Sequence, residues 1–295
     1  MGYDRSTLSA LTRFFSSAVF REMAKKGRSP LFGRLINQTD LSQKCGRHAK
    51  VADAFDMAFS ILKKSGHRDE YVYRVALAHK VLMGKHSLKT ASMLNEFRAG
   101  SSRADIVILN GTATVYEIKS ERDSLARLAN QVRNYQRVFA SVNVIASEGH
   151  VKGVLDVVPD DVGVMCLTSR YRISTIRDAI DDPERVCPSA IFESLRAAEA
   201  ESVLKALGVA IPSVPNTRRH AMLREFFLQQ DPAGVHAQMV RTLKRTRSLS
   251  LLSDLIDQLP RSLHAAALSI PLRRAEHDRL AAAVGTRLDA AMAWA

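Results

Sequence analysis

The sequence predicts an α/β fold, with a mixed sheet in the central region and helical segments on both sides of it. The main observation is a set of three short segments rich in β-branched and aromatic residues. Gly100-Ser101 and Asn110-Gly111 separate them and are strong hairpin-turn signals. Three consecutive antiparallel strands are therefore expected, over residues 93–100, 101–111 and 112–120.

Helical patterns precede and follow these strands. A helix is expected over 69–84, where Tyr73, Leu77 and Val81 recur at four-residue spacing behind an acidic first turn. A second helix is expected over 124–140, followed by strands over 141–147 and 163–169 that a short helix over 150–158 connects. The central region thus has the predicted order α-β-β-β-α-β.

The two ends of the chain have a different pattern. Residues 1–66 are expected to form a basic helical extension, and residues 67–180 the central α/β region. Residues 181–295 are rich in Ala, Leu and Arg and are interrupted by prolines, which predicts a helical C-terminal domain. We therefore expect three consecutive domains.

The composition indicates a polyanionic partner and a reducing compartment. Lys plus Arg number 43 against 30 Asp plus Glu, a formal net charge of +13. The three cysteines are far apart and form no Cys-x-x-Cys pair. Without a long apolar run or a secretory pattern at the start, we expect a cytoplasmic protein with no membrane segment.

Acidic and basic side chains on the second and third strands indicate a site. Glu117 and Lys119 are two residues apart on a strand and therefore project from one face. A two-residue loop at Asn110-Gly111 would turn Asp105 to the opposite face, whereas a three-residue loop or a bulge returns it to the face of Glu117. We expect the irregular hairpin, with Gly111 supplying a positive φ.

A further acid is expected beside Asp105. With Gly100-Ser101 as a two-residue loop, Ala99 pairs with Ser102 and Glu96 lies opposite Asp105. Three carboxylates gathered on one face repel one another unless a cation lies among them. Glu70, on the preceding helix, is an alternative for the additional acid.

These residues resemble a known superfamily. The segment RADIVILNGTATVYEIK is similar to the D-x(n)-E-x-K signature of PD-(D/E)XK nucleases, of the RecB-like or Holliday-junction-resolvase-like type found in bacteria and phages. Gln131 and Tyr135 are similar to the Q-x-x-x-Y motif of the RecB-like branch and lie one helical turn apart. Ala104 stands where many members have proline. The resemblance covers roughly residues 68–170.

The resemblance implies a metal-dependent phosphodiesterase that acts on DNA. Asp105 and Glu117, with Glu96, would hold Mg²⁺ or Mn²⁺, and Lys119 would position the attacking water or stabilise the developing negative charge. Gln131 would contact the site or the nucleic acid, and Tyr135 would buttress it or pack in the core. Further nucleic-acid-binding candidates are the basic residues Arg103, Arg241, Lys244 and Arg245, although the charges on the C-terminal helices are also typical of a solvated helix face.

Two other functions stay open at this stage. The first is a non-catalytic nucleic-acid-binding or partner-regulating protein on the same fold, with the helical ends as surfaces for a second copy or another protein. The second is an enzyme with RNA as its substrate. The sequence leaves open whether cleavage would be endonucleolytic or exonucleolytic.

Overall fold

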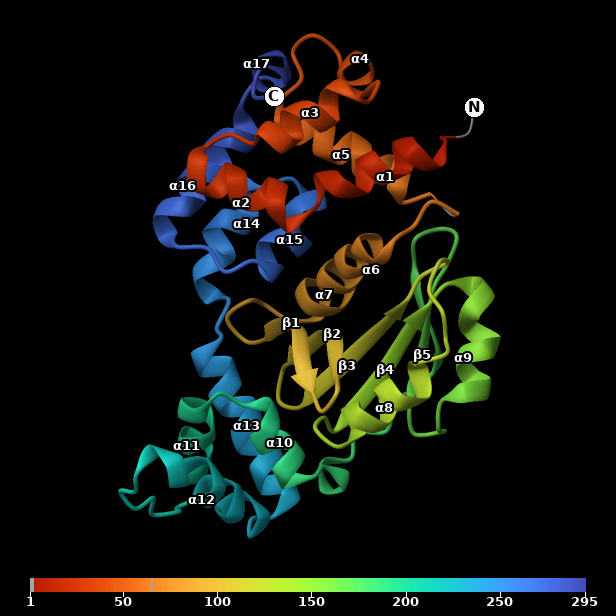
Figure 1. The fold of residues 1–295 in the computed structure, drawn as a ribbon. Coiled ribbons are helices and arrows are strands. Elements are labelled where there is room, and N and C mark those ends of the chain that lie inside the picture. The colour runs from red at the N-terminus through yellow and green to blue at the C-terminus, as the bar shows by residue number, and fades with distance from the viewer. Residues whose placement is uncertain (1–2, 65) are drawn as a thin grey trace. The chain divides into compact units, whose positions relative to one another are not determined.

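The computed structural model describes residues 3–64 and 66–295, which form two compact units (Figure 1). The helical unit comprises the residues up to His79, together with Ser169–Tyr171 and Ser250–Ala295. The sheet unit comprises Lys80–Thr168 and Arg172–Leu249. These units differ from the three consecutive domains expected, 1–66, 67–180 and 181–295, because the last helices belong with the first ones.

The helical unit combines the two ends of the chain. Its main helices are α1 (Arg5–Phe14), α2 (Ser17–Lys26), α3 (Pro30–Asn37), α4 (Leu41–Cys45), α5 (Val51–Leu62), α6 (Glu70–Leu77), α14 (Ser253–Gln258), α15 (His264–Ser269), α16 (Arg274–Gly285) and α17 (Leu288–Met292). The Val51 N–H donates to Thr286 O at 2.9 Å, and the Leu288 N–H donates to Ala49 O at 2.8 Å. Main-chain hydrogen bonds therefore join segments from opposite ends of the sequence.

The sheet unit contains a mixed sheet of six strands in the order β1-β2-β3-β4-β5-β6. Their bounds are β1 (Ser92–Ala99), β2 (Ser102–Leu109), β3 (Ala113–Lys119), β4 (Ser141–Ala146), β5 (Gly163–Leu167) and β6 (Ile173–Arg177). The first three strands are antiparallel, β3, β4 and β5 are parallel, and β6 is antiparallel to β5. The α/β class and the five predicted strands are confirmed.

The sixth strand was not predicted from the sequence. It pairs only with β5, and its side chains are half-buried or exposed, so it lacks the apolar pattern of a buried strand. The segment Ile173–Arg177 contains Ser174, Thr175 and a terminal arginine. An edge strand needs no apolar face to be stable, which explains the missing signal.

The sheet unit also contains several helices. They are α7 (Met83–Lys85), α8 (Leu128–Gln136), α9 (Val151–Val157), α10 (Pro188–Ser194), α11 (Ala197–Ala206), α12 (Asn216–Leu228) and α13 (Pro232–Thr246). The predicted helix over 69–84 is α6, capped by the Asp69 side chain, followed by a π-helical turn at Ala78–Leu82 and then by α7. Buried residues of α8 and α13, among them Val132 and Met239, share one core with the sheet. Among the described helices, none combines the length and the apolar character needed to cross a bilayer.

His236 on α13 is a buried titratable group of the sheet unit. It is 3% exposed, and its Nε2 accepts a hydrogen bond from the Ala140 N–H at 3.4 Å. Burial penalises the charged ring and lowers the pKa of His236 to about 4, although the charge of Asp181 partly opposes this effect. The native protein therefore holds this side chain neutral at pH values where an unfolded chain would protonate it.

We expect the free energy of unfolding to fall as the pH drops from about 6.5 towards 4, because the unfolded chain then binds a proton that the native chain excludes. The loss attributable to His236 is at most about 3 kcal/mol. Urea unfolding followed by circular dichroism across this range would measure it. The His236→Gln variant should lose much of this dependence, whereas His48→Gln, at an exposed histidine, should retain it. Equal pH dependence in the two variants would contradict the assignment.

Candidate active site

The hairpin between β2 and β3 has the register that a common site requires. Leu109 pairs with Ala113 and Ile106 pairs with Tyr116, so the loop has three residues, and the same register sets Asp105 opposite Glu117. Gly111, in the middle of the loop, has φ +125°, which glycine adopts readily. The prediction of an irregular hairpin is confirmed.

The two strands part at the point where the acids lie. The last β2–β3 pair is Ile106 with Tyr116; beyond it β2 continues to pair with β1, and β3 with β4. Asp105 Oδ2 accepts a hydrogen bond from the Ile118 N–H at 2.7 Å. A side-chain carboxylate thus replaces a main-chain partner at the opening, which fixes Asp105 between the strands.

Glu117 lies at the centre of a buried hydrogen-bond network. It is 2% exposed, and its Oε1 accepts from Lys119 Nζ at 2.9 Å and from Gln131 Nε2 at 2.5 Å. Lys119 Nζ also donates to Gln131 Oε1 at 3.0 Å. The Gln131 amide therefore bridges both members of the ion pair, and each buried charge has polar partners.

Tyr135 on α8 completes this network. Its hydroxyl donates towards Glu117 Oε2 at 2.7 Å and lies 2.8 Å from Arg103 O, an acceptor on β2 near the strand opening. Burial, followed by the negative charge of Glu117, raises the pKa of Tyr135 far above its usual value. The phenol therefore stays neutral and serves as a donor at the strand opening.

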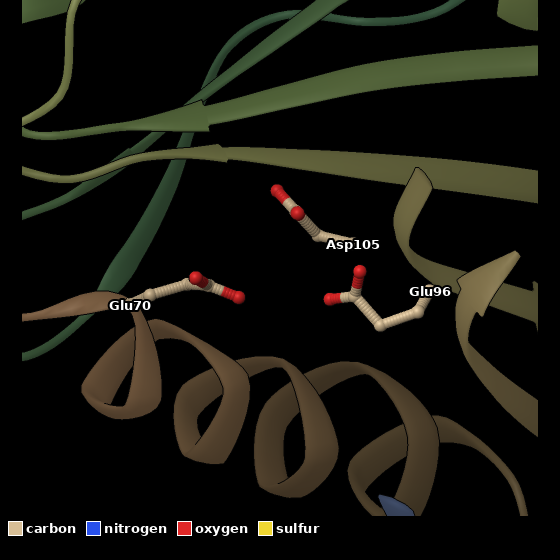
Figure 2. Close-up of side chains that lie close together, drawn as sticks. All are labelled: Glu70, Glu96 and Asp105. Carbon is tan, nitrogen blue, oxygen red and sulfur yellow. The ribbon is translucent and has the colours of Figure 1, made fainter. Parts of the chain in front are cut away.

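Glu96 lies beside Asp105 in a conformation that is rare for glutamate. Its φ is +53°, and it stands between the pairs Asn95 with Ile106 and Phe97 with Ala104, opposite Asp105 as predicted. The confirmed two-residue loop of this hairpin pairs Ala99 with Ser102. Carboxylate oxygens of Glu96 and Asp105 lie within 4.8 Å of each other (Figure 2).

The predicted cluster is thus divided into two neighbouring groups of the sheet unit. Glu96 and Asp105 form one group, and Glu117 does not join them within the same distance. Glu117 and Lys119 form the other, together with Gln131 and Tyr135 from α8. The Asp105–Ile118 hydrogen bond connects the two groups, because Ile118 lies between Glu117 and Lys119 on β3.

The alternative for the additional acid is Glu70, on the helix that precedes the strands, which is also labelled in Figure 2. It belongs to α6 of the helical unit, where its Oε1 accepts a hydrogen bond from Arg74 Nε at 2.6 Å. Its role as a metal ligand stays a prediction.

The donor set suits a hard divalent cation. Carboxylate oxygens are the protein ligands that Mg²⁺ and Mn²⁺ prefer, and Glu96 and Asp105 are exposed and half-buried respectively. Glu117 is buried and accepts three hydrogen bonds, two on Oε1 and one on Oε2, which leaves a single lone pair of Oε2 for a cation. In the described conformation, Glu96 and Asp105 are therefore the more accessible pair.

The predicted basic residues do not contact these acids. Arg103 is exposed on β2, Arg241 and Arg245 are exposed on α13, and Lys244 is half-buried. Among the described residues, none of the four side chains forms an ion pair with another group. Their role in binding nucleic acid stays a prediction.

Asn134 is a supporting residue that the sequence reasoning did not single out. Its Nδ2 lies 3.1 Å from Ser101 Oγ and 2.8 Å from Ser102 Oγ, so it ties α8 to the turn between β1 and β2. Asn134 is three residues from Gln131, so the two lie on one face of α8, and that spacing was a usable signal.

The fold and the site define an α/β protein with acidic residues at a split between strands of a mixed sheet. The chain matches the family described as Bacteriophage P4 protein cII over residues 63–256, and it belongs to that family. The matched range includes every candidate site residue named above.

The chain is similar to a curated phage protein and to a solved structure. Protein cII of Enterobacteria phage P4 is 35% identical over 108 residues, which are 36% of this chain and 40% of the phage protein, so the match spans less than half of that relative. A protein of unknown function from Silicibacter pomeroyi is 19% identical, with 49% of this chain and 99% of that one covered and a TM-score of 0.32.

Removal of the Tyr135 hydroxyl should destabilise the protein. In Tyr135→Phe, the buried Glu117 carboxylate and the Arg103 carbonyl lose the donor that they share, and we expect the free energy of unfolding to fall by about 1–3 kcal/mol. Urea unfolding would measure it. Tyr3→Phe, which removes an exposed hydroxyl bound to Lys44, is the matched control and should change stability by less than about 0.5 kcal/mol. Equal effects of the two substitutions would refute the structural importance of this hydroxyl.

Proposed function

We propose that this protein is a metal-dependent nuclease that hydrolyses phosphodiester bonds of DNA. The proposal is carried by the register that sets Asp105 opposite Glu117 where β2 and β3 part, with Lys119 on the same strand as Glu117. The resemblance to the D-x(n)-E-x-K signature and the net charge of +13 support it.

The acids would hold the cation. Asp105 and Glu96 would supply the first oxygens, and Glu117 a further one through the remaining lone pair of Oε2. A bound Mg²⁺ or Mn²⁺ would polarise the scissile phosphate and lower the pKa of a bound water. The main-chain bond from Ile118 limits the rotation of Asp105, so its second oxygen has a defined direction.

Lys119 would act on the negative charge of the phosphate. An ammonium group has three donors, and Glu117 Oε1 and Gln131 Oε1 accept from two of them. The third donor can reach a phosphate oxygen or the attacking water while the first two keep the side chain in place. Gln131 and Tyr135 are positioning residues in this scheme because they act through Glu117 and Lys119.

Cleavage should depend on Lys119. We expect the purified protein to cut DNA with Mg²⁺ or Mn²⁺ and to stop when EDTA is added. In Lys119→Ala the cleavage rate should fall by at least about 100-fold, because the developing negative charge loses its donor. Linear, circular and branched DNA, with RNA beside them, would be resolved on gels. Lys152→Ala, at an exposed lysine of α9, is the control and should retain the rate. Activity that survives Lys119→Ala would refute this assignment.

The two candidates for the additional acid can be separated by metal affinity. We expect Glu96→Gln to weaken Mn²⁺ binding by roughly tenfold, since one carboxylate next to Asp105 is lost while the shape is kept. Isothermal titration of Mn²⁺ into Glu96→Gln, Glu70→Gln and the wild type would compare them without relying on cleavage. A normal affinity in Glu96→Gln with a weakened one in Glu70→Gln would transfer the role to Glu70.

A second candidate function is a non-catalytic nucleic-acid-binding protein. The observation that favours it is the burial of Glu117, whose carboxylate accepts three hydrogen bonds from within the protein. It requires DNA binding in EDTA that weakens as salt is raised, no cleavage in any divalent metal, and weaker binding when Arg241, Lys244 and Arg245 are replaced by glutamine.

A further inference from the structure

We propose that the helical unit has its own surface for a nucleic-acid phosphate backbone, a basic cluster where the end of α2 meets the start of α16. Its members are Lys25, Lys26, Arg28, Arg273 and Arg274, all exposed. None of them belongs to the candidate active site, so the surface stands whether or not the protein cleaves DNA.

The fold brings the two parts of the cluster together. The Arg279 side chain of α16 donates from Nε to Ala24 O near the end of α2, at 3.0 Å, across 255 positions of sequence. Figure 1 shows α2 and α16 side by side within the helical unit. Lys25 and Arg273 line one hollow of about 460 Å³, together with Pro271, Leu272 and Glu276. The cluster is therefore a property of the folded unit and not of one segment.

Glu22 and Glu276, acids on the two helices of the cluster, both accept hydrogen bonds from neighbouring groups of the protein. Glu22 Oε2 accepts from Ser29 Oγ at 2.6 Å and from the Leu31 N–H at 3.3 Å, at the start of α3. Glu276 Oε2 accepts from the Arg273 N–H at 2.7 Å, at the start of α16. Among the described residues, no ion pair involves any of the five cations, so their positive charge is available to a ligand.

Helix stability accounts for only part of the cluster. Lys25 and Lys26 lie in the last turn of α2, where cations are favoured by the helix dipole. Arg273 and Arg274 lie at the N-terminal end of α16, where the same effect is unfavourable by about 0.3–1 kcal/mol per charge. The two arginines thus work against their own helix, and an anionic partner would offset that cost.

A nucleic acid fits this surface better than a membrane does. Lasting attachment to a lipid surface combines cations with exposed apolar side chains that enter the acyl region, because each cation alone adds only about 1 kcal/mol. The large apolar side chains that are exposed among the described residues lie outside α2, α16 and their flanking loops: Val157, Ile176, Ile180, Leu228 and Leu251. Several exposed cations on one surface match the regularly repeated phosphates of a duplex.

The test is equilibrium binding of the full chain to a fluorescently labelled DNA duplex of 20 base pairs, in EDTA so that cleavage plays no part. We expect the double variant Lys25→Gln/Arg273→Gln to bind on the order of tenfold more weakly at low salt, with a smaller slope of log K against log salt, by about 2 units. The double variant Arg47→Gln/Lys64→Gln removes two exposed charges elsewhere in the helical unit and should change binding little. Thermal unfolding would confirm that both variants are folded.

Two further variants make the result unambiguous. Lys25→Arg/Arg273→Lys keeps the charge and should bind like the wild type, and Lys25→Gln alone serves if the double variant does not fold. Equal weakening in the cluster and control variants would overturn the proposal. If the cluster variants lose binding to vesicles of anionic phospholipid while their duplex binding is unchanged, the proposal is overturned in favour of a membrane surface. Because the assay contains EDTA and none of these substitutions lies in the candidate active site, its outcome does not depend on whether the protein cleaves DNA.

Discussion

The hydrogen bond from the Ile118 N–H to the Asp105 carboxylate is the constraint on which the site depends. Two adjacent strands of a sheet normally satisfy each other's main-chain groups along their whole length. Here the ladder ends early, and a side chain takes over one of the vacated positions. The strands can therefore stay apart here without leaving the Ile118 N–H unsatisfied, and this hydrogen bond fixes the orientation of the Asp105 carboxylate. The same opening exposes the Arg103 carbonyl to the hydroxyl of Tyr135.

Burying charges near that gap is possible because α8 supplies complementary polar groups. A buried lysine and glutamate are costly to desolvate unless their remaining donors and acceptors are satisfied. Gln131 accepts a hydrogen bond from Lys119 and donates one to Glu117, while Tyr135 donates a second one to the Glu117 carboxylate. A glutamine and a tyrosine one helical turn apart are thus sufficient to hold the pair without an additional ion pair.

Much of this could be predicted from the sequence, because hairpin registers follow from turn length. Gly100 and Gly111 located both loops, and the requirement that Asp105 and Glu117 share a face selected the correct second loop. The positive φ of Glu96 could not be predicted. Alternate residues of a regular strand face the core, but on β1 the buried positions Leu94 and Phe97 are three residues apart. A strict alternation read from the sequence therefore fails at Glu96. The division into units was also beyond local patterns, since it depends on packing between the two ends of the chain.

The π-helical turn at Ala78–Leu82 has a consequence for how this chain tolerates changes in length. A turn of this kind holds one residue more than an ordinary helical turn. Deleting one position there would restore regular 3.6-residue geometry, whereas deletion within α6 or α8 would rotate every following side chain by about 100°. Natural variants of the family that differ by one amino acid in this stretch should therefore keep the sheet intact.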